Sequence, residues 1–437
     1  MGSGLNSMEG SLNIQIAIDI LKNRNFSLLT MGQVISQLGE NLNKVAMLWF
    51  VYQFSHKAAD LAWVGILQTL PPLLFGWFTG PILDRVSRKN VMIFIDITRG
   101  LLLLLIPVLY HNELLTLPIL FILVFLISVV SGIFGPALYA SIPELVRRDQ
   151  IVSANALMQT TGQVGMLLGP ITGGVLIGLW NAPFVMIVNA VTFFLSALFL
   201  LMMKLPSPHR STAFSFLTLL QETREGFQFV FNGKSNLLPL FVIMTLYGFI
   251  TGPFSLILPV YTKLVLHQGP QTLGFLLSIM GLGMLGASML LTSAPPIQYE
   301  KWIAGALIFG GLMLTATGWL QPILFASITI ALIGASFSAF NPLAHTIIQT
   351  QAPEILLART LSTMSIGFLL GAIGGMGLFP ALLHLIGVGP VFSLMGLIFL
   401  IGGLIFLRRS IKKESPQETL SIAQHLPISI GTNRNES

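Results

Sequence analysis

The sequence contains no cysteine, and few of its residues are charged. Of 437 residues, 9% are Asp, Glu, Lys or Arg and 54% are hydrophobic, whereas about 25% of residues are charged in soluble domains. So little polar surface cannot cover a globule in water, which excludes a soluble enzyme and a disordered chain. Without cysteine there is no disulfide framework, thiolate metal site or cysteine nucleophile. We therefore expect an integral membrane protein.

The sequence also lacks the motifs of ATP-driven and catalytic proteins. It has no phosphate-binding loop or nucleotide motif, so ATP-driven pumping by this chain is not expected. No nucleophile is paired with a base, and His345 and His384 are too isolated to suggest a metal site. We therefore predict a protein that is not an enzyme and has no catalytic residue, no cofactor and no metal site.

Long apolar runs fill most of the chain. A helix needs about 20 mostly apolar residues to cross roughly 30 Å of hydrocarbon, and the sequence contains twelve such runs. We therefore predict an all-α membrane protein with twelve transmembrane helices. The predicted spans are 27–53, 61–83, 91–110, 116–142, 152–179, 182–203, 237–263, 272–292, 302–319, 322–345, 359–385 and 388–408.

The positions of the basic residues predict the orientation, because cytoplasmic loops carry an excess of Lys and Arg. With the N-terminus inside, only Lys57 and Lys263 of the 22 basic residues fall in outside loops, while Lys44 and Arg99 lie at membrane depth. Both termini are therefore predicted to be cytoplasmic. The net charge of +6 then follows from topology, and no nucleic-acid partner is expected.

The chain also divides into two related halves. The longest polar connection follows the sixth predicted span, and Pro143-Glu144 after the fourth span is matched by Pro353-Glu354 after the tenth. Duplicated bundles of this kind form transporters that bind substrate near the midplane. The predicted divisions are a cytoplasmic N-terminal segment (1–26), a six-helix bundle (27–203), a cytoplasmic linker (204–236), a second six-helix bundle (237–408) and a cytoplasmic tail (409–437).

Two motifs carry a resemblance to a known family. The loop after the second span reads Gly80-Pro-Ile-Leu-Asp84-Arg85-Val-Ser-Arg88-Lys89, and the fifth span contains Gly165-Met-Leu-Leu-Gly169-Pro170-Ile-Thr-Gly173-Gly174. The loop resembles the signature of the major facilitator superfamily, with Ser87 where that family usually has glycine. The fifth span resembles the Gly-Pro-x-x-Gly-Gly motif of the superfamily's exporters. The chain looks most like the branch of enterobactin exporters and macrolide efflux proteins.

This resemblance implies the major facilitator fold, in which two pseudo-symmetric six-helix bundles rock around a central site. The loop residues would form a conformational latch that continues into the third helix, where Asp96 and Arg99 share a helix face and are expected to pair structurally. The implied latch consists of Gly80, Asp84, Arg85, Arg88, Asp96 and Arg99. Small residues at every fourth position would allow close helix packing. That packing set is Gly165, Gly169, Pro170 and Gly173.

The first predicted helix carries a stripe of polar residues at helical spacing, namely Gln33, Gln37, Glu40, Asn41 and Lys44. A charge at mid-bilayer costs at least about 2.5–3.5 kcal/mol on insertion scales, so this stripe must face a cavity or a partner. Glu40 and Lys44 stand in the i, i+4 order that favours an ion pair. We predict that Glu40, together with Lys44, binds and releases a coupling proton. The alternative is a static buried ion pair.

Polar residues on other predicted spans are candidates for the same cavity, although each alone can serve as a hydrogen-bonding residue between helices. The predicted substrate-binding set is Gln37, Glu40, Asn41, Lys44, Gln163, Asn189, Thr192, Tyr247 and Asn341. Aromatic residues would line the remaining surface, namely Phe193, Phe254 and Phe340. A wide and mostly neutral cavity of this kind suits a bulky amphipathic molecule.

The sequence therefore predicts a monomeric, proton-coupled exporter of a siderophore, macrolide or similar molecule in a bacterial inner membrane. Its expected partners are the lipid bilayer, the substrate and protons. Three alternatives stay open. Ser36-x-x-x-Glu40 with Asn189-x-x-Thr192 would offer oxygen ligands in a ferroportin-like metal transporter. A wide apolar cavity would suit a lysophospholipid flippase, and the third alternative is a transport-dead receptor or scaffold.

Overall fold

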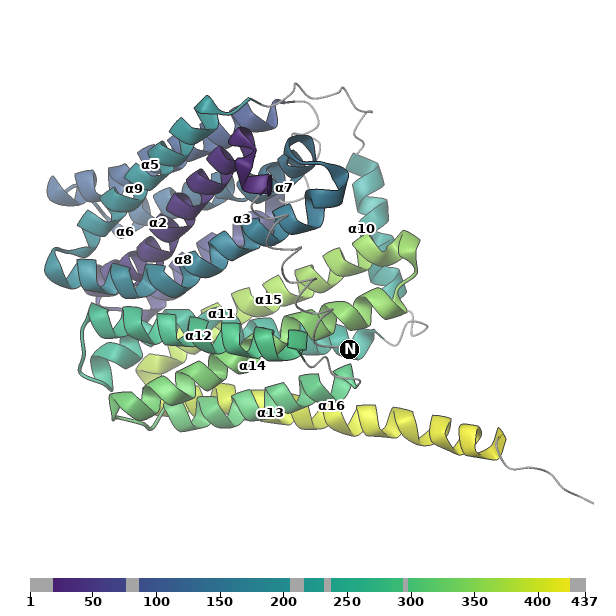
Figure 1. Ribbon diagram of the computed structural model, residues 1–437. Coiled ribbons are helices and arrows are strands. Elements are labelled where there is room, and N and C mark those ends of the chain that lie inside the picture. Colours follow the sequence, from purple (N-terminus) through teal and green to yellow (C-terminus); the bar gives the residue numbers. More distant parts are fainter. Residues whose placement is uncertain (1–18, 76–85, 205–215, 232–236, 294–297, 425–437) are drawn as a thin grey trace, which may run out of the picture.

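The computed structural model describes residues 19–75, 86–204, 216–231, 237–293 and 298–424, and every regular element in these ranges is a helix (Figure 1). The N-terminal helices are α2 (Arg24–Ser55), α3 (Ala58–Phe75), α5 (Arg88–His111), α6 (Leu117–Ser131), α7 (Phe134–Leu145), the 3₁₀ turn η2 (Arg148–Gln150), α8 (Ile151–Leu179) and α9 (Ala182–Met202). After α10 (Phe216–Phe231), the C-terminal helices are α11 (Leu238–Leu264), α12 (Pro270–Ser293), α13 (Tyr299–Thr317), α14 (Ile323–Gln351), α15 (Glu354–Ile386) and α16 (Val388–Gln424).

Ten helical stretches of the described chain are long and apolar enough to cross a membrane, with α6 and α7 forming one continuous stretch. The helices α2 and α13 are not among them. In α2 the polar stripe interrupts the apolar sequence, which lowers its hydropathy. The helical membrane protein predicted from composition is therefore found, whereas the number of twelve spans and the orientation of the termini stay predictions.

Three boundaries differ from the predicted ones. The fourth predicted span is broken between Ser131 and Phe134, where α6 ends and α7 begins. Pro136 stands in the first turn of α7, the position where a missing N–H costs no helical hydrogen bond. The predicted linker contains α10, and α16 continues to Gln424, well past the predicted end at residue 408. Figure 1 shows this helix projecting beyond the rest of the C-terminal helices.

The helices pack mainly within the N-terminal and the C-terminal group. The helix α2 lies against α8 and α9, and α5 also packs on α9. In the other group α11 packs on α15, α12 on α14, and α13 on both α14 and α16. In Figure 1 the purple-to-teal N-terminal helices form one layer and the green-to-yellow C-terminal helices another. One hydrophobic cluster nevertheless extends through both layers, and a second, smaller cluster lies in the N-terminal layer.

The two layers meet through α8 with α12 and through α3 with α15. At the first contact, a Cβ atom built on Gly174 would lie 2.6 Å from the backbone oxygen of Pro270, so only glycine allows this approach. Nearby, the backbone N–H of Ile171 donates a hydrogen bond of 3.0 Å to Ser278 Oγ across the same junction. At the second contact, the Thr69 hydroxyl donates to Met376 Sδ at 3.8 Å.

Three glycines of the exporter-like motif, Gly165, Gly169 and Gly173, face α2. Cβ atoms built on Gly165 and Gly173 would lie 2.8 Å from the backbone oxygens of Gln37 and Leu42. The Cβ of Gly169 would lie 2.5 Å from that of Asn41. The backbones of α2 and α8 therefore touch along this stripe, as small residues permit in membrane helices. This contact fixes the rotation of α2 about its own axis.

The described part of the latch set anchors α5 within the N-terminal layer. Arg88 donates to the backbone oxygen of Ala140 at 2.6 Å and forms an ion pair of 2.7 Å with Glu144. Lys89 Nζ donates to the backbone oxygens of Leu201 and Met203 at the end of α9. The predicted latch residues Gly80, Asp84 and Arg85 lie outside the described residues.

Candidate transport cavity

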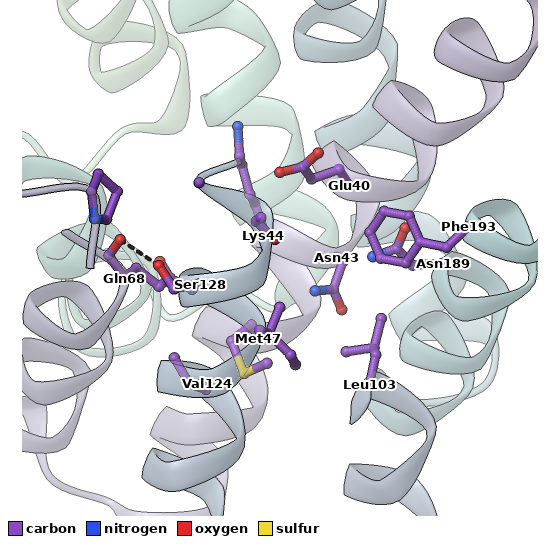
Figure 2. A pocket seen from close by; sticks show the side chains of 14 residues that line it. Glu40, Asn43, Lys44, Met47, Gln68, Leu103, Val124, Ser128, Asn189 and Phe193 are labelled. Atoms are coloured by element: carbon purple, nitrogen blue, oxygen red, sulfur yellow. Dashed lines mark hydrogen bonds between the residues drawn. The ribbon is translucent and has the colours of Figure 1, made fainter. Parts of the chain in front are cut away.

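A cavity of about 340 Å³ lies among the N-terminal helices, with walls from α2, α3, α5, α6 and α9 (Figure 2). Its volume is at the lower end of the range for small-molecule pockets, about 300–1,000 Å³. The predicted cavity combined residues of both halves, whereas the lining of this cavity comes from the N-terminal helices and Gly132.

The helix α2 contributes four side chains to the wall, at positions i, i+3, i+4 and i+7. They are Glu40, Asn43, Lys44 and Met47, which lie one above another on a single helix face. Asn43 Oδ1 is buried and has no hydrogen-bond partner in the described structure. An unpaired amide oxygen of this kind is costly unless a ligand or water donates to it. Asn43 therefore offers a ready acceptor for a bound molecule.

The predicted ion pair between Glu40 and Lys44 is not formed in the described structure. Lys44 Nζ donates instead to Asn41 Oδ1 at 3.0 Å, and Asn41 Nδ2 donates to the backbone oxygen of Gln37 at 2.7 Å. Figure 2 shows the Glu40 and Lys44 side chains lying near each other at the same end of the cavity, without a bond between them. The Glu40 carboxylate therefore stays available to a ligand or to a proton.

The structure divides the polar stripe of α2 between two faces. Glu40 and Lys44 line the cavity, whereas Asn41 is buried against the glycines of α8. Gln33 is also buried, and Gln37 is not among the lining residues. A step of one residue turns a helix by about 100°, so neighbouring polar residues cannot all face one way. Asn41 therefore supports Lys44 from the side and does not itself line the cavity.

The opposite walls come from α9 and from the contact of α3 with α6. Asn189 and Phe193 on α9 face the cavity, and Asn189 Oδ1 accepts a hydrogen bond of 3.1 Å from Thr192. The Ser128 hydroxyl donates 2.7 Å to the backbone oxygen of Gln68, which joins α6 to α3 at the cavity edge (Figure 2). This bond holds the two helices that close one side of the cavity.

The cavity has a polar end and an apolar end. Figure 2 shows Glu40 and Lys44 together at one end, with Asn43 between them and the apolar side chains Met47, Val124 and Leu103. An amphipathic molecule could place its polar group at the first end and its apolar body at the second. Burial of apolar surface contributes about 25 cal/mol per Å² and would supply much of the binding free energy.

Several predicted cavity residues lie elsewhere. Gln163 on α8 and Asn341 on α14 are exposed, and neither is among the lining residues. Tyr247 is buried on α11, where its hydroxyl donates 2.9 Å to the backbone oxygen of Phe337 and its ring stacks on Phe340. Phe254 belongs to the same buried aromatic cluster. Of the three aromatic residues predicted to line the cavity, only Phe193 does so.

Asn43, Gln68 and Ser128 line the cavity but were not among the predicted residues. For Asn43 the sequence held a signal, because it stands three residues after Glu40 on the same helix face. Gln68 and Ser128 had no comparable signal. Both are uncharged polar residues in apolar spans, and only the packing of α3 on α6 brings them together.

Directly behind Phe193, α5 carries a buried charge pair. Arg99 contacts Asp96 on its own helix, and the two side chains are 4% and 0% exposed. Arg99 also contacts the rings of Phe134 and Phe193, so the pair is surrounded by N-terminal helices. The structural pairing expected for these residues is present, and it lies in the interior of the N-terminal layer, next to the cavity.

Comparisons with known proteins place this architecture among membrane transporters. A family model described as a transmembrane secretion effector matches residues 17–430. The multidrug efflux pump Tap of Mycolicibacterium fortuitum is 26% identical over 385 residues, covering 85% of this chain and 89% of Tap. Macrolide efflux protein A of Streptococcus pyogenes is 22% identical over 356 residues, covering 78% of this chain and 87% of that protein.

Solved structures agree with the fold at low sequence identity. A POT family transporter, in complex with a thioalcohol-conjugated peptide, aligns with a TM-score of 0.70 and 14% identity, covering 89% of this chain and 96% of that one. The nucleoside transporter NupG aligns with a TM-score of 0.70 and 12% identity, covering 88% and 98%. At such identities the likeness extends to the fold alone.

Proposed function

The chain belongs to the transmembrane secretion effector family of major facilitator transporters, and we propose that it is a proton-coupled exporter of an amphipathic small molecule. The membership confirms the resemblance seen in the loop and fifth-span motifs. Tap and macrolide efflux protein A carry efflux in their names, which favours export as the direction. The proposed location is a bacterial inner membrane, with the protein acting as a monomer.

The observation that carries this proposal is the two-ended cavity with a free carboxylate. Glu40 lines the polar end without an ion pair to Lys44, and Asn43 presents an unpaired oxygen beside it. The apolar end would hold a hydrocarbon or aromatic body. A charged group at membrane depth is expensive and is kept chiefly where it serves transport. The cavity chemistry therefore matches an amphipathic substrate with a polar or cationic group.

The proposed cycle uses competition at Glu40. A substrate that donates a hydrogen bond or a positive charge to the carboxylate binds best when Glu40 is ionised. Protonation of Glu40 from the outer side removes that attraction and releases the substrate. Loss of the proton to the cytoplasm restores the ionised site. Because each species favours one state of a two-state bundle, the exchange of substrate for proton drives the rocking motion.

The alternatives have less support from the geometry. Of the four oxygen-bearing residues assigned to the ferroportin-like site, only Glu40 and Asn189 line the cavity, which disfavours that alternative. The lysophospholipid flippase is separated from the proposed exporter by the transport test below. A transport-dead receptor would have no evident use for a free carboxylate at membrane depth.

The test uses inside-out vesicles with an acidic lumen and a pH-sensitive dye. A siderophore, a macrolide, a lysophospholipid and ferrous ion are added in turn to vesicles containing the native chain, Glu40→Gln or Glu113→Gln. Glu113 is an exposed loop carboxylate, so its variant is the matched control. Proton release on adding one organic compound, lost in Glu40→Gln and kept in Glu113→Gln, is the expected result. Release that persists in Glu40→Gln would refute the role of Glu40.

A further inference from the structure

The Asp96–Arg99 pair on α5 has an unusual set of neighbours. Two aromatic rings contact the Arg99 guanidinium, because its central carbon lies 4.7 Å from the ring centroid of Phe134 and 4.2 Å from that of Phe193. Such contacts stabilise a cation by roughly 2 kcal/mol or more when water is excluded. Arg99 is therefore held in place by two groups other than Asp96.

The pair is also incompletely satisfied. Asp96 Oδ2 and Arg99 Nε are buried without a hydrogen-bond partner in the described structure, and so is Ser196 Oγ on α9. The Ser196 hydroxyl acts on the Asp96 carboxylate from α9. A pair that served only to stabilise the fold would normally have these groups bonded, since each costs free energy when left alone. The arrangement instead leaves one carboxylate oxygen open.

The pair lies just behind the cavity wall. Phe193 covers Arg99 on one side and lines the cavity on the other. The ionisable groups that act on Asp96 are Arg99 on its own helix and Glu40 on α2, while α9 contributes the Ser196 hydroxyl and α7 the Phe134 ring. Lys44 is exposed and donates its hydrogen bond to Asn41, so it forms no ion pair with Glu40. The Asp96 carboxylate is thus acted on by a cation and by an anion, Arg99 and Glu40.

We propose that Asp96 is a second proton-binding carboxylate of this transporter, sharing a coupling proton with Glu40 across the Phe193 wall. The inference rests on the proposed proton-coupled function and adds a site to it. With Asp96, Glu40 and Arg99 all ionised, the group carries one net negative charge in a region of low dielectric. One proton on either carboxylate brings it to zero, which a buried site favours.

The transfer changes no covalent bond other than O–H bonds. A proton that leaves Glu40 through cavity water binds Asp96 Oδ2, and the new O–H can donate to Ser196 Oγ. The contact of Arg99 with Asp96 then changes from an ion pair to a hydrogen bond to a neutral acid. The Phe134 and Phe193 rings keep the guanidinium in place, while the ionised Glu40 balances its charge. A static ion pair would need no such second support.

The first test is infrared difference spectroscopy of the full chain in vesicles of phosphatidylethanolamine and phosphatidylglycerol. Spectra are recorded from about pH 4 to 9, the range that the pKa values of buried carboxyl groups can span. A protonated buried acid gives its own carbonyl stretching band. We expect this band in the native protein and its loss in Asp96→Asn, while Ser196→Ala keeps it at a shifted frequency. Absence of the band from the native protein, or its persistence in Asp96→Asn, overturns the proposal.

Asp96→Glu serves if Asp96→Asn does not fold as judged by gel filtration. The Asp96→Glu variant keeps a carboxyl group. A shift of the band frequency in this variant assigns the band to residue 96 and supports the proposal, whereas an unshifted band overturns the proposal. Neither measurement needs a substrate. A native protein with the Asp96 band but no transport would therefore contradict the proposed export function and leave the proton site standing.

Transport supplies the second test. Asp96→Asn is expected to reduce gradient-driven accumulation to the level seen without a gradient, while it keeps downhill substrate exchange. A purely structural role would reduce both together or neither. Accumulation in Asp96→Asn with native pH dependence, or a parallel loss of both activities in protein that folds normally, would overturn the proposal.

Discussion

The contact between α2 and α8 gives a sharp test of the packing, because two glycines on α8 differ only in what surrounds them. A Cβ on Gly169 would lie 2.5 Å from Asn41 Cβ and 3.0 Å from the Asn41 carbonyl carbon. A Cβ on Gly162 would meet nothing within 4 Å. Gly169→Ala therefore pushes two backbones apart, whereas Gly162→Ala adds a methyl group to open space.

The expected magnitudes follow from these distances. Forcing an extra carbon into a packed contact costs about 1–3 kcal/mol. Replacing Gly by Ala in a helix returns at most about 1 kcal/mol. For Gly169→Ala the cost exceeds the gain, and the shift also disturbs the contacts of Gly165 and Gly173 on the same face. For Gly162→Ala only the gain applies.

The assay is the thermal unfolding midpoint of detergent-solubilised protein, followed by fluorescence-detected gel filtration at a fixed heating rate. We expect the midpoint of Gly169→Ala to fall below that of the native protein, and that of Gly162→Ala to equal or exceed it. A Gly169→Ala protein as stable as the native chain would show that α2 and α8 do not touch as described. Equal destabilisation by both variants would show that glycine flexibility, and not contact, is what matters.

Three further predictions concern single contacts. Glu144→Gln breaks the partly exposed ion pair with Arg88 and should lower the free energy of unfolding by at most about 1 kcal/mol. The shift of the thermal unfolding midpoint should therefore be smaller than the shift that Gly169→Ala gives. Ser278→Ala removes the 3.0 Å hydrogen bond that the Ile171 N–H donates between the two layers, which is worth about 0.5–1.5 kcal/mol. Spin labels at introduced cysteines should then report a larger separation of α8 and α12. An unchanged distance distribution would contradict this prediction. Asn43→Leu fills part of the cavity and removes its unpaired hydrogen-bond acceptor. The KM for transport should therefore rise, while the thermal unfolding midpoint stays the same or rises. An unchanged KM would place the substrate elsewhere.

The sequence alone determined that this is a helical membrane protein and which family it belongs to. Low charge and long apolar runs require that most of the chain is buried in lipid, where helices satisfy the backbone hydrogen bonds. This requirement holds whatever the tertiary contacts are. Helical spacing also placed Glu40 and Lys44 on one face of α2, and the glycines of α8 on one stripe. These features depend on local geometry, which the order of residues fixes directly.

Tertiary structure decided which neighbour covers each face. Periodicity grouped Asn41 with Glu40, but the close approach of Gly169 rotates α2 so that Asn41 is buried and Glu40 lines the cavity. Lys44 donates a hydrogen bond of 3.0 Å to Asn41 Oδ1 and forms no ion pair with Glu40. The contacts of Arg99 with the rings of Phe134 and Phe193 join residues of α5, α7 and α9 that no spacing in the sequence relates. Rotation and packing of whole helices depend on contacts between distant segments, so they become visible only when the helices are assembled.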